Sequence, residues 1–159
     1  MRVAIRPRVL QLTHMDSVDA FDLNRFLTAQ AGQYDVAIGE LRSGQKRSHW
    51  MWYIFPQING LGMSATSKRY AITSADEARA YLNHPILGTR LTACADTLLS
   101  IDGRSAAEIF GYPDDMKLRS SMTLFKQVAG ANSIFELVLN KYFAGTDDNA
   151  TKQIWAGLG

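Results

Sequence analysis

Apolar residues along most of this chain recur every three or four positions, which is the spacing of one face of an α-helix. Between Leu23 and Leu41 this pattern predicts one or two helices, interrupted near Gly32. The stretches 85–101 and 113–130 show the same spacing and predict two more. In the last stretch the apolar side would consist of Leu118, Met122, Phe125 and Ala129.

Helix starts are marked by the sequence Ser-x-x-Glu, which occurs at Ser74, Ser105 and Ser133. In this capping box the serine hydroxyl accepts a bond from the amide three residues on, and the glutamate reaches back to the serine amide. The helix after Ser133 should end near Gly145. Its expected inner face is Ile134, Leu137, Val138, Lys141 and Tyr142, where only the lysine is polar and its stem can lie along the core.

Residues 50–63 break this pattern. Aromatic and β-branched residues are followed there by Pro56, Asn59, Gly60 and Gly62, which favours a loop or a short extended segment. The sequence therefore predicts an all-α, single compact globular domain of six or seven helices with one irregular aromatic-rich loop.

The domain is expected to span residues 16–159. Residues 1–15 are interpreted as an N-terminal extension, either flexible or the product of a mis-assigned start, and translation from Met1 or from Met15 fits the sequence equally. The chain has 159 residues and 47% hydrophobic residues, enough for one core. It shows no secretory signal and no apolar run long enough to span a bilayer. We expect a cytoplasmic protein without a membrane partner.

Cysteine and histidine are scarce. With Cys94 as its one cysteine and three scattered histidines, the chain shows no metal-ligand spacing, and we expect neither a metal nor a cofactor. Cys94 fits a small core residue in the predicted helix 85–101. His84 stands directly before Pro85 and is interpreted as a residue that precedes or caps this helix.

Charge is distributed unevenly. The net charge is +2, but the first 15 residues hold three arginines and no acid, so the remainder is nearly balanced. Generic binding to duplex nucleic acid is therefore not expected. Between Leu41 and Ala75 there is no acid, whereas five basic residues are present: Arg42, Lys46, Arg47, Lys68 and Arg69. This acid-free window would face an anionic ligand or form solvated positive surface.

The segment "KRSHWMWYIFPQ" lies within the acid-free window. Lys46, Arg47 and Ser48, together with Arg69, are candidates to hold phosphate, because an arginine fork and a hydroxyl both bond its oxygens. Trp50 and Trp52 are candidates to stack on a base. The alternative is that these aromatics form core. His49 is the best candidate for a general acid or base, unless it is bonded to backbone inside that core.

A second candidate group lies in the predicted helix 113–130. Lys117, Ser120 and Ser121 share one helix face, and such mixed faces form pockets or buried polar networks. Lys117 is a candidate catalytic residue, because a desolvated lysine can attack a sugar carbon or move protons. The alternative is a surface ion pair with Asp114, three residues earlier.

Several blocks, among them "ELRSGQKRSHWMWYIFPQINGLG", "EARAYLNHPILGTRL" and "EIFGYPDDMKLRSSMTLF", occur here in an order that resembles the bacterial domain of unknown function 1810. The resemblance runs from about residue 22 to residue 143 and implies an all-helical fold. Calpain inhibition, implied by the calpastatin label sometimes given to this family, would need disordered repeats that this chain lacks. A looser similarity, in size and in the "KLRSSMTLF" helix, links the chain to NADAR proteins, which are associated with ADP-ribose chemistry.

Two functions remain open. The first is binding or hydrolysis of an ADP-ribose-like or other phosphorylated nucleoside, with His49 or Lys117 acting at the N-glycosidic bond. The second is a non-catalytic protein-interaction module without small-molecule chemistry, in which the aromatic segment is a docking patch. The sequence indicates no oligomeric state.

Overall fold

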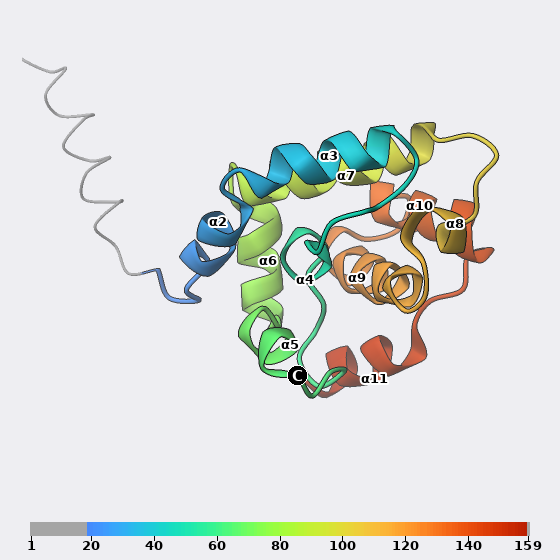
Figure 1. Cartoon of the computed structure of the whole chain (residues 1–159). Coiled ribbons are helices and arrows are strands. Elements are labelled where there is room, and N and C mark those ends of the chain that lie inside the picture. The colour runs from blue at the N-terminus through green and yellow to red at the C-terminus, as the bar shows by residue number, and fades with distance from the viewer. Residues whose placement is uncertain (1–18, 159) are drawn as a thin grey trace, which may run out of the picture.

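A computed structural model describes residues 19–158 of the chain, so the predicted extension 1–15 lies outside the described residues. This range contains ten helices and no β-strand, which confirms the all-α class (Figure 1). The helices are α2 Asn24–Gln30, α3 Gln33–Arg42, α4 Met51–Ile54, α5 Ala65–Arg69, α6 Ala75–Asn83, α7 Leu87–Ser100, α8 Ala106–Phe110, α9 Asp114–Ala129, α10 Ile134–Phe143 and α11 Asn149–Gly157.

The predicted number of six or seven helices is therefore too low. The segment expected to be a loop contains α4, and α5 follows it directly; these helices have only four and five residues. A helix of one turn is too short to show a repeating apolar face, so periodicity gives no sign of it. Around α4 the chain is irregular as expected, and residues 57–59 pair with Ile72 through an isolated parallel bridge.

Helix α9 lies in the middle of the fold and packs against α6, α8, α10 and α11 (Figure 1). Helices α3 and α7 run side by side along one edge, and α7 also contacts α6 and α10. One hydrophobic core joins them. Its largest fully buried side chains are Trp50, Tyr81, Phe26, Phe55, Phe125 and Phe135.

The predicted helix starts are confirmed. The hydroxyls of Ser74, Ser105 and Ser133 each accept a bond from the amide three residues on. The reciprocal bond forms at Ser105, whose amide donates to Glu108. At Ser74 the carboxylate of Glu77 instead accepts bonds from Thr73 and from Arg25, at 2.7 Å. The same motif thus marks three helix starts, and one of its acids ties α6 to α2.

Two features fix the start of α7. The Nδ1 atom of His84 accepts bonds from the amides of Ile86 and Leu87, which confirms the capping role. One turn later Gly88 lies so close to α6 that a Cβ atom would stand 1.9 Å from the carbonyl oxygen of Leu82. Only a residue without a side chain fits there. Cys94 is buried in the same helix, as expected.

The apolar faces of α9 and α10 differ from those predicted. In α10 the buried residues are Phe135, Val138 and Leu139, whereas Leu137 is 46% exposed. The ring of Phe135 packs on that of Phe125, so the side of α10 that carries Phe135 faces the core. In α9 Leu118, Met122 and Phe125 are buried as predicted, but Ala129 is exposed. Surrounded by four helices, α9 also buries Ser121, Thr123 and Leu124.

Lys141 has a more definite role than the predicted one. Its ammonium group donates to the carbonyl oxygens of Leu98, Leu99 and Ile101, where α7 ends. A cation at this position satisfies the free carbonyls and complements the negative end of the helix dipole. None of the helices in the described range is both long and apolar enough to cross a membrane.

Candidate functional site

The carboxylate of Glu40, on α3, holds the loop that leads into α4. It accepts hydrogen bonds from the amides of Arg47 and Ser48, at 2.8 and 2.9 Å, from the Ser48 hydroxyl at 2.5 Å and from Trp50 Nε1 at 2.9 Å. Burial opposes the charged form, but these bonds outweigh it and lower the pKa of Glu40 to about 2. The loop is therefore folded around an ionised carboxylate.

This arrangement places two of the predicted ligand-binding residues. Trp50 is fully buried, and its ring packs against Phe55 and Phe110. The Ser48 hydroxyl is bonded to Glu40. In this conformation both side chains serve the loop itself, and Trp50 offers no open face for stacking.

Lys46, Asp114 and Lys117 form a three-residue group, called here the lysine–aspartate cluster. The ammonium group of Lys46 lies 2.8 Å from one carboxylate oxygen of Asp114, and that of Lys117 lies 3.0 Å from the other. Lys46 Nζ also donates to the backbone carbonyl of Ser48, two residues further along the loop, at 2.6 Å. The backbone amide of Lys46 donates to the carbonyl of Ile109, which fixes the loop beside the start of α9.

Two indoles flank the cluster. Lys46 Nζ lies 5.0 Å from the ring centre of Trp50, and Lys117 Nζ lies 4.2 Å from that of Trp52. Both distances suit cation–π attraction. Unlike Trp50, Trp52 is only partly buried. The cluster therefore has one apolar wall that solvent can reach.

The electrostatics of the cluster centre on Asp114. Burial disfavours its charge, but the hydrogen bonds from Lys46 and Lys117 lower its pKa overall. The Lys46 side chain is 7% exposed, whereas Asp114 and Lys117 are 20% and 22% exposed. The group carries one net positive charge, with Lys46 inside and Lys117 nearer to solvent. The Asp114–Lys117 pair predicted from spacing is present, and Lys46 adds a third member to it.

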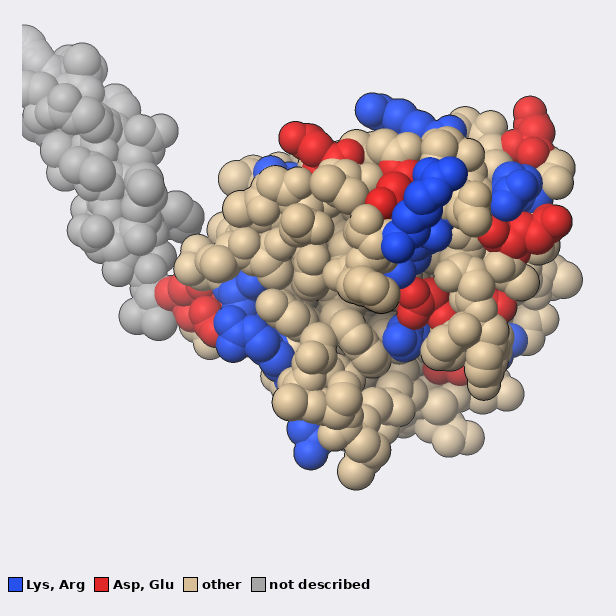
Figure 2. Space-filling view, viewed as in Figure 1, with Lys and Arg blue, Asp and Glu red and all other residues tan. Residues whose placement is uncertain are grey.

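The acid-free window is not a uniformly positive surface in three dimensions. Glu40 and Asp114, which lie outside it in sequence, both contact residues 46–50. Figure 2 shows Lys and Arg side chains beside Asp and Glu side chains on the face that includes the loop between α3 and α4 and the start of α9. The positive charge available to a ligand is therefore local.

The remaining predicted site residues lie on the loop before α4, on α9 and on α5. Arg47 and His49 are exposed on the same loop. Ser120, by contrast, donates to the Met116 carbonyl and to Asp148 at the start of α11, and Ser121 is fully buried. Arg69 is exposed on α5 with its guanidinium 5.5 Å from the Tyr70 ring. Within residues 19–158, no hydrogen bond or ion pair joins Arg69, Ser120 or Ser121 to the lysine–aspartate cluster.

Comparison with known proteins places the chain in a family. A family model described as "Protein of unknown function (DUF1810)" matches residues 20–155. The chain belongs to the DUF1810 family. A crystal structure of the conserved hypothetical protein Rv1873 from Mycobacterium tuberculosis is similar to this one, with a TM-score of 0.85. The two sequences are 51% identical, and the match covers 87% of this chain and 99% of the Rv1873 chain. The comparison with curated proteins found no match. The resemblance inferred from the sequence blocks is thus confirmed.

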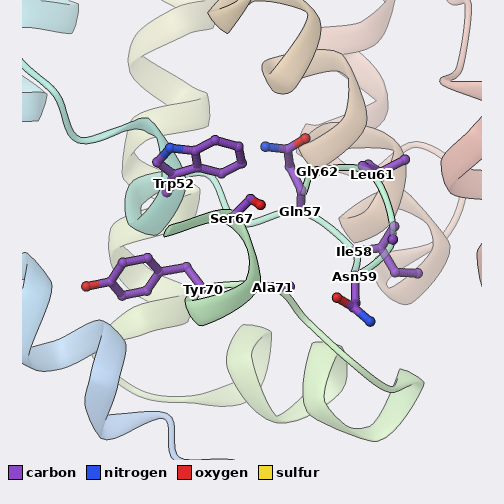
Figure 3. A pocket seen from close by; sticks show the side chains of 10 residues that line it. Trp52, Gln57, Ile58, Asn59, Leu61, Gly62, Ser67, Tyr70 and Ala71 are labelled. Carbon is purple, nitrogen blue, oxygen red and sulfur yellow. The ribbon is translucent and has the colours of Figure 1, made fainter. Parts of the chain in front are cut away.

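A small cavity is lined by Trp52 in this DUF1810 protein and lies between the loop 57–62 and α5 (Figure 3). The volume open to the centre of a water molecule is about 10 Å³, room for about one water. Its lining side chains with polar atoms are those of Gln57, Asn59, Ser67, Tyr70 and Trp52.

Sequence reasoning missed Glu40 of this DUF1810 site, the contact of Asp114 with Lys46, and Gln57 beside the site. Glu40 is the last acid before the acid-free window. Its position could have indicated that the hydrogen-bond donors of the following loop bond to its carboxylate. Asp114 was assigned to Lys117 alone, since spacing reveals only partners on the same helix. Gln57 gave no signal. In the described range, no three His, Cys, Asp or Glu residues are grouped to hold a metal ion.

Proposed function

We propose that this DUF1810 protein binds a phosphorylated nucleoside, such as ADP-ribose, at the lysine–aspartate cluster and Trp52. The observation that carries the proposal is that two lysines from distant parts of the chain share one carboxylate beside a partly exposed indole. Phosphate and a planar ring are the two groups that lysine and tryptophan bind together.

Lys117 is the residue assigned to phosphate. An ammonium group has three N–H donors, and Asp114 takes one of them at 3.0 Å. Its side chain is 22% exposed, so a phosphate oxygen can approach the remaining donors. The ion pair uses Lys117 as a cation, which suits it to phosphate rather than to nucleophilic attack. Arg47, exposed on the adjacent loop, would add a planar fork.

Hydrolysis of the N-glycosidic bond is the second step of the proposal. Water would add its oxygen to the anomeric carbon as the carbon–nitrogen bond breaks, one proton would leave the water, and the departing base would gain one. His49 is assigned to this proton transfer, because it is exposed on the loop that carries Lys46 and imidazole is the side chain that most often serves as a general acid or base.

Isothermal titration tests the binding step. ADP-ribose, NAD and inorganic pyrophosphate are titrated into the wild-type protein and into Lys117→Met, which keeps the stem and removes the charge. Micromolar to millimolar binding is expected for the wild type, and Lys117→Met should weaken it at least about tenfold, the effect of one charge-assisted hydrogen bond. Lys68→Met, an exposed lysine on α5, is the matched control.

Absence of heat from every phosphate compound would overturn the proposal. If ADP-ribose and NAD bind, chromatography of each incubated compound shows whether free base is released, and His49→Ala should slow that release without weakening binding. Release at an unchanged rate removes His49 from the mechanism.

One observation favours the alternative, a protein-interaction module. Tyr112, next to the start of α9, and Met63 are each 83% exposed. Under this alternative no phosphorylated compound binds, and Tyr112→Ser rather than Lys117→Met changes the complexes that the protein forms in its own cell extract, as measured by native electrophoresis.

A further inference from the structure

The small cavity beside Trp52 has rigid walls. The amide of Asn59 donates to the carbonyl of Ile72 at 2.8 Å, and the amide of Ile72 donates to the carbonyl of Gln57 at 2.9 Å. These paired bonds hold the backbone on both sides of Ile58 against the segment after α5. The fold therefore fixes where the Gln57 side chain begins.

The opposite wall approaches equally closely. A Cβ atom on Gly62 would stand 2.7 Å from the Cβ of Ser67, so this part of the loop packs directly on α5. The Ser67 hydroxyl donates its proton to the carbonyl of Ser64, at 2.8 Å. Ser67 thus has no proton left for a guest in the cavity. The Tyr70 hydroxyl and the Trp52 indole nitrogen are directed away from Gln57 (Figure 3), so we consider the side-chain amides of Gln57 and Asn59 as donors.

Gln57 is the unusual member of this lining. The residue is only 8% exposed, and its Nε2 atom is buried without a hydrogen-bond partner in the described chain. Figure 3 shows its amide nitrogen directed toward the indole of Trp52. A buried donor without an acceptor destabilises the fold, so such groups are rare unless something else satisfies them.

The lining indicates which chemistry would satisfy Gln57. No Lys, Arg, Asp or Glu is among the residues that line the cavity. An anionic oxygen would therefore be buried without a counter-charge, which is costly, whereas an uncharged oxygen is not. The room is that of about one heavy atom, so a group enters by its tip and not by its whole ring.

We infer that the cavity beside Trp52 takes a ring carbonyl oxygen of a nucleobase, which accepts a hydrogen bond from Gln57 Nε2. This inference rests on the proposed function, because the phosphate of the same ligand is assigned to Lys117, which also contacts Trp52. Trp52 is the wall that both sites share, with Lys117 Nζ 4.2 Å from its ring centre. Gln57 would then select nucleosides whose base carries a carbonyl over those whose base carries only amino groups. Among phosphorylated nucleosides, those with a carbonyl-bearing base would therefore bind more tightly than ADP-ribose, whose base is adenine.

Inosine and adenosine 5′-monophosphate are a matched pair for the test, because at ring position 6 the first has a carbonyl and the second an amino group. Both are titrated calorimetrically into the wild-type protein and into Gln57→Met, which has a similar length and no donor. The wild type should bind the inosine compound about tenfold more tightly, the contribution of one hydrogen bond to a buried donor. In Gln57→Met the ratio should fall to about one.

Gln33→Met, at an exposed glutamine of α3, is the control and should keep the wild-type ratio. Thermal unfolding of Gln57→Met checks its fold; the melting temperature should not decrease, since the change removes an unsatisfied buried donor. Equal affinity of the wild type for the two nucleotides, or an unchanged ratio in Gln57→Met, would overturn this inference alone. If neither nucleotide binds and ADP-ribose, NAD and pyrophosphate also give no heat, the proposed function fails as well.

Discussion

At the scale of single residues, Glu40 has the largest effect on the shape of the site. One carboxylate organises two amides, a hydroxyl and an indole N–H in the loop that carries Lys46, Arg47 and His49. Charge-assisted bonds of this kind are stronger than neutral ones. The position of the candidate ligand-binding side chains therefore depends on a residue that itself faces no ligand.

Glu40→Gln should lower the free energy of unfolding by about 1–3 kcal/mol at neutral pH, because the bonds to the ionised carboxylate are weakened. The ordinary pKa of 4.5 is lowered to about 2 in the fold, so this contribution is complete above about pH 4.5 and is lost as the pH falls toward 2. Urea unfolding of both proteins between pH 7 and pH 3 measures it: the difference between them should shrink with acid.

The control for Glu40 is Asp96→Asn, an exposed acid of α7, which should show no such difference at any pH. A difference between wild type and Glu40→Gln that stays constant down to pH 3 would contradict the lowered pKa.

At the scale of elements, the contact of α6 with α7 depends on a missing side chain. Gly88→Ala places a Cβ atom 1.9 Å from a backbone oxygen, which cannot move as a flexible side chain does. The two helices must separate, and the free energy of unfolding should decrease by at least about 3 kcal/mol.

Gly39→Ala is the matched variant, because Gly39 also lies inside a helix, α3, but has no atom within 4 Å of its would-be Cβ. There alanine should stabilise the protein by up to about 1 kcal/mol through its helix propensity. Urea unfolding compares the two. Similar effects of both substitutions would show that the α6–α7 contact is looser than described.

How far elements can be predicted from sequence depends on how local their causes are. The cap hydroxyls of Ser74, Ser105 and Ser133 bond within three residues, and all three helix starts were predictable. The orientation of α10 was not, because it follows from the contact of Phe135 with Phe125 on another helix. Local signals therefore place helices, and packing between helices decides which side of each is buried.

The same distinction holds for the candidate site. Lys46 and Lys117 were selected from two separate patterns, and nothing in the sequence indicated that one carboxylate, Asp114, would join them. The buried amide of Gln57 depends on backbone pairing with Ile72 and was beyond sequence reasoning. The candidate side chains could therefore be predicted from the sequence. Their partners could not, because these lie on distant segments that come together only in the folded protein.

At the scale of the whole molecule, charge is mixed rather than segregated. Residues 19–158 carry fourteen basic and fourteen acidic side chains, and Figure 2 shows both signs on one face. Because the described residues carry no net charge, we expect no binding to duplex DNA at about 0.15 M salt. Fluorescence anisotropy of a labelled duplex checks this; binding that weakens steeply with added salt would contradict it.

The three tryptophans stand in three different surroundings, which makes the protein its own optical reporter. Trp50 is sealed in the core, Trp52 borders solvent beside an ammonium group, and Trp155 lies on α11 with the Arg79 guanidinium 5.9 Å from its ring. A variant with phenylalanine at positions 50 and 155 would emit from Trp52 alone. The fluorescence emission of this variant would then report on Trp52 alone, so that ligand binding at Lys117 or in the cavity beside Gln57 would change the emission spectrum.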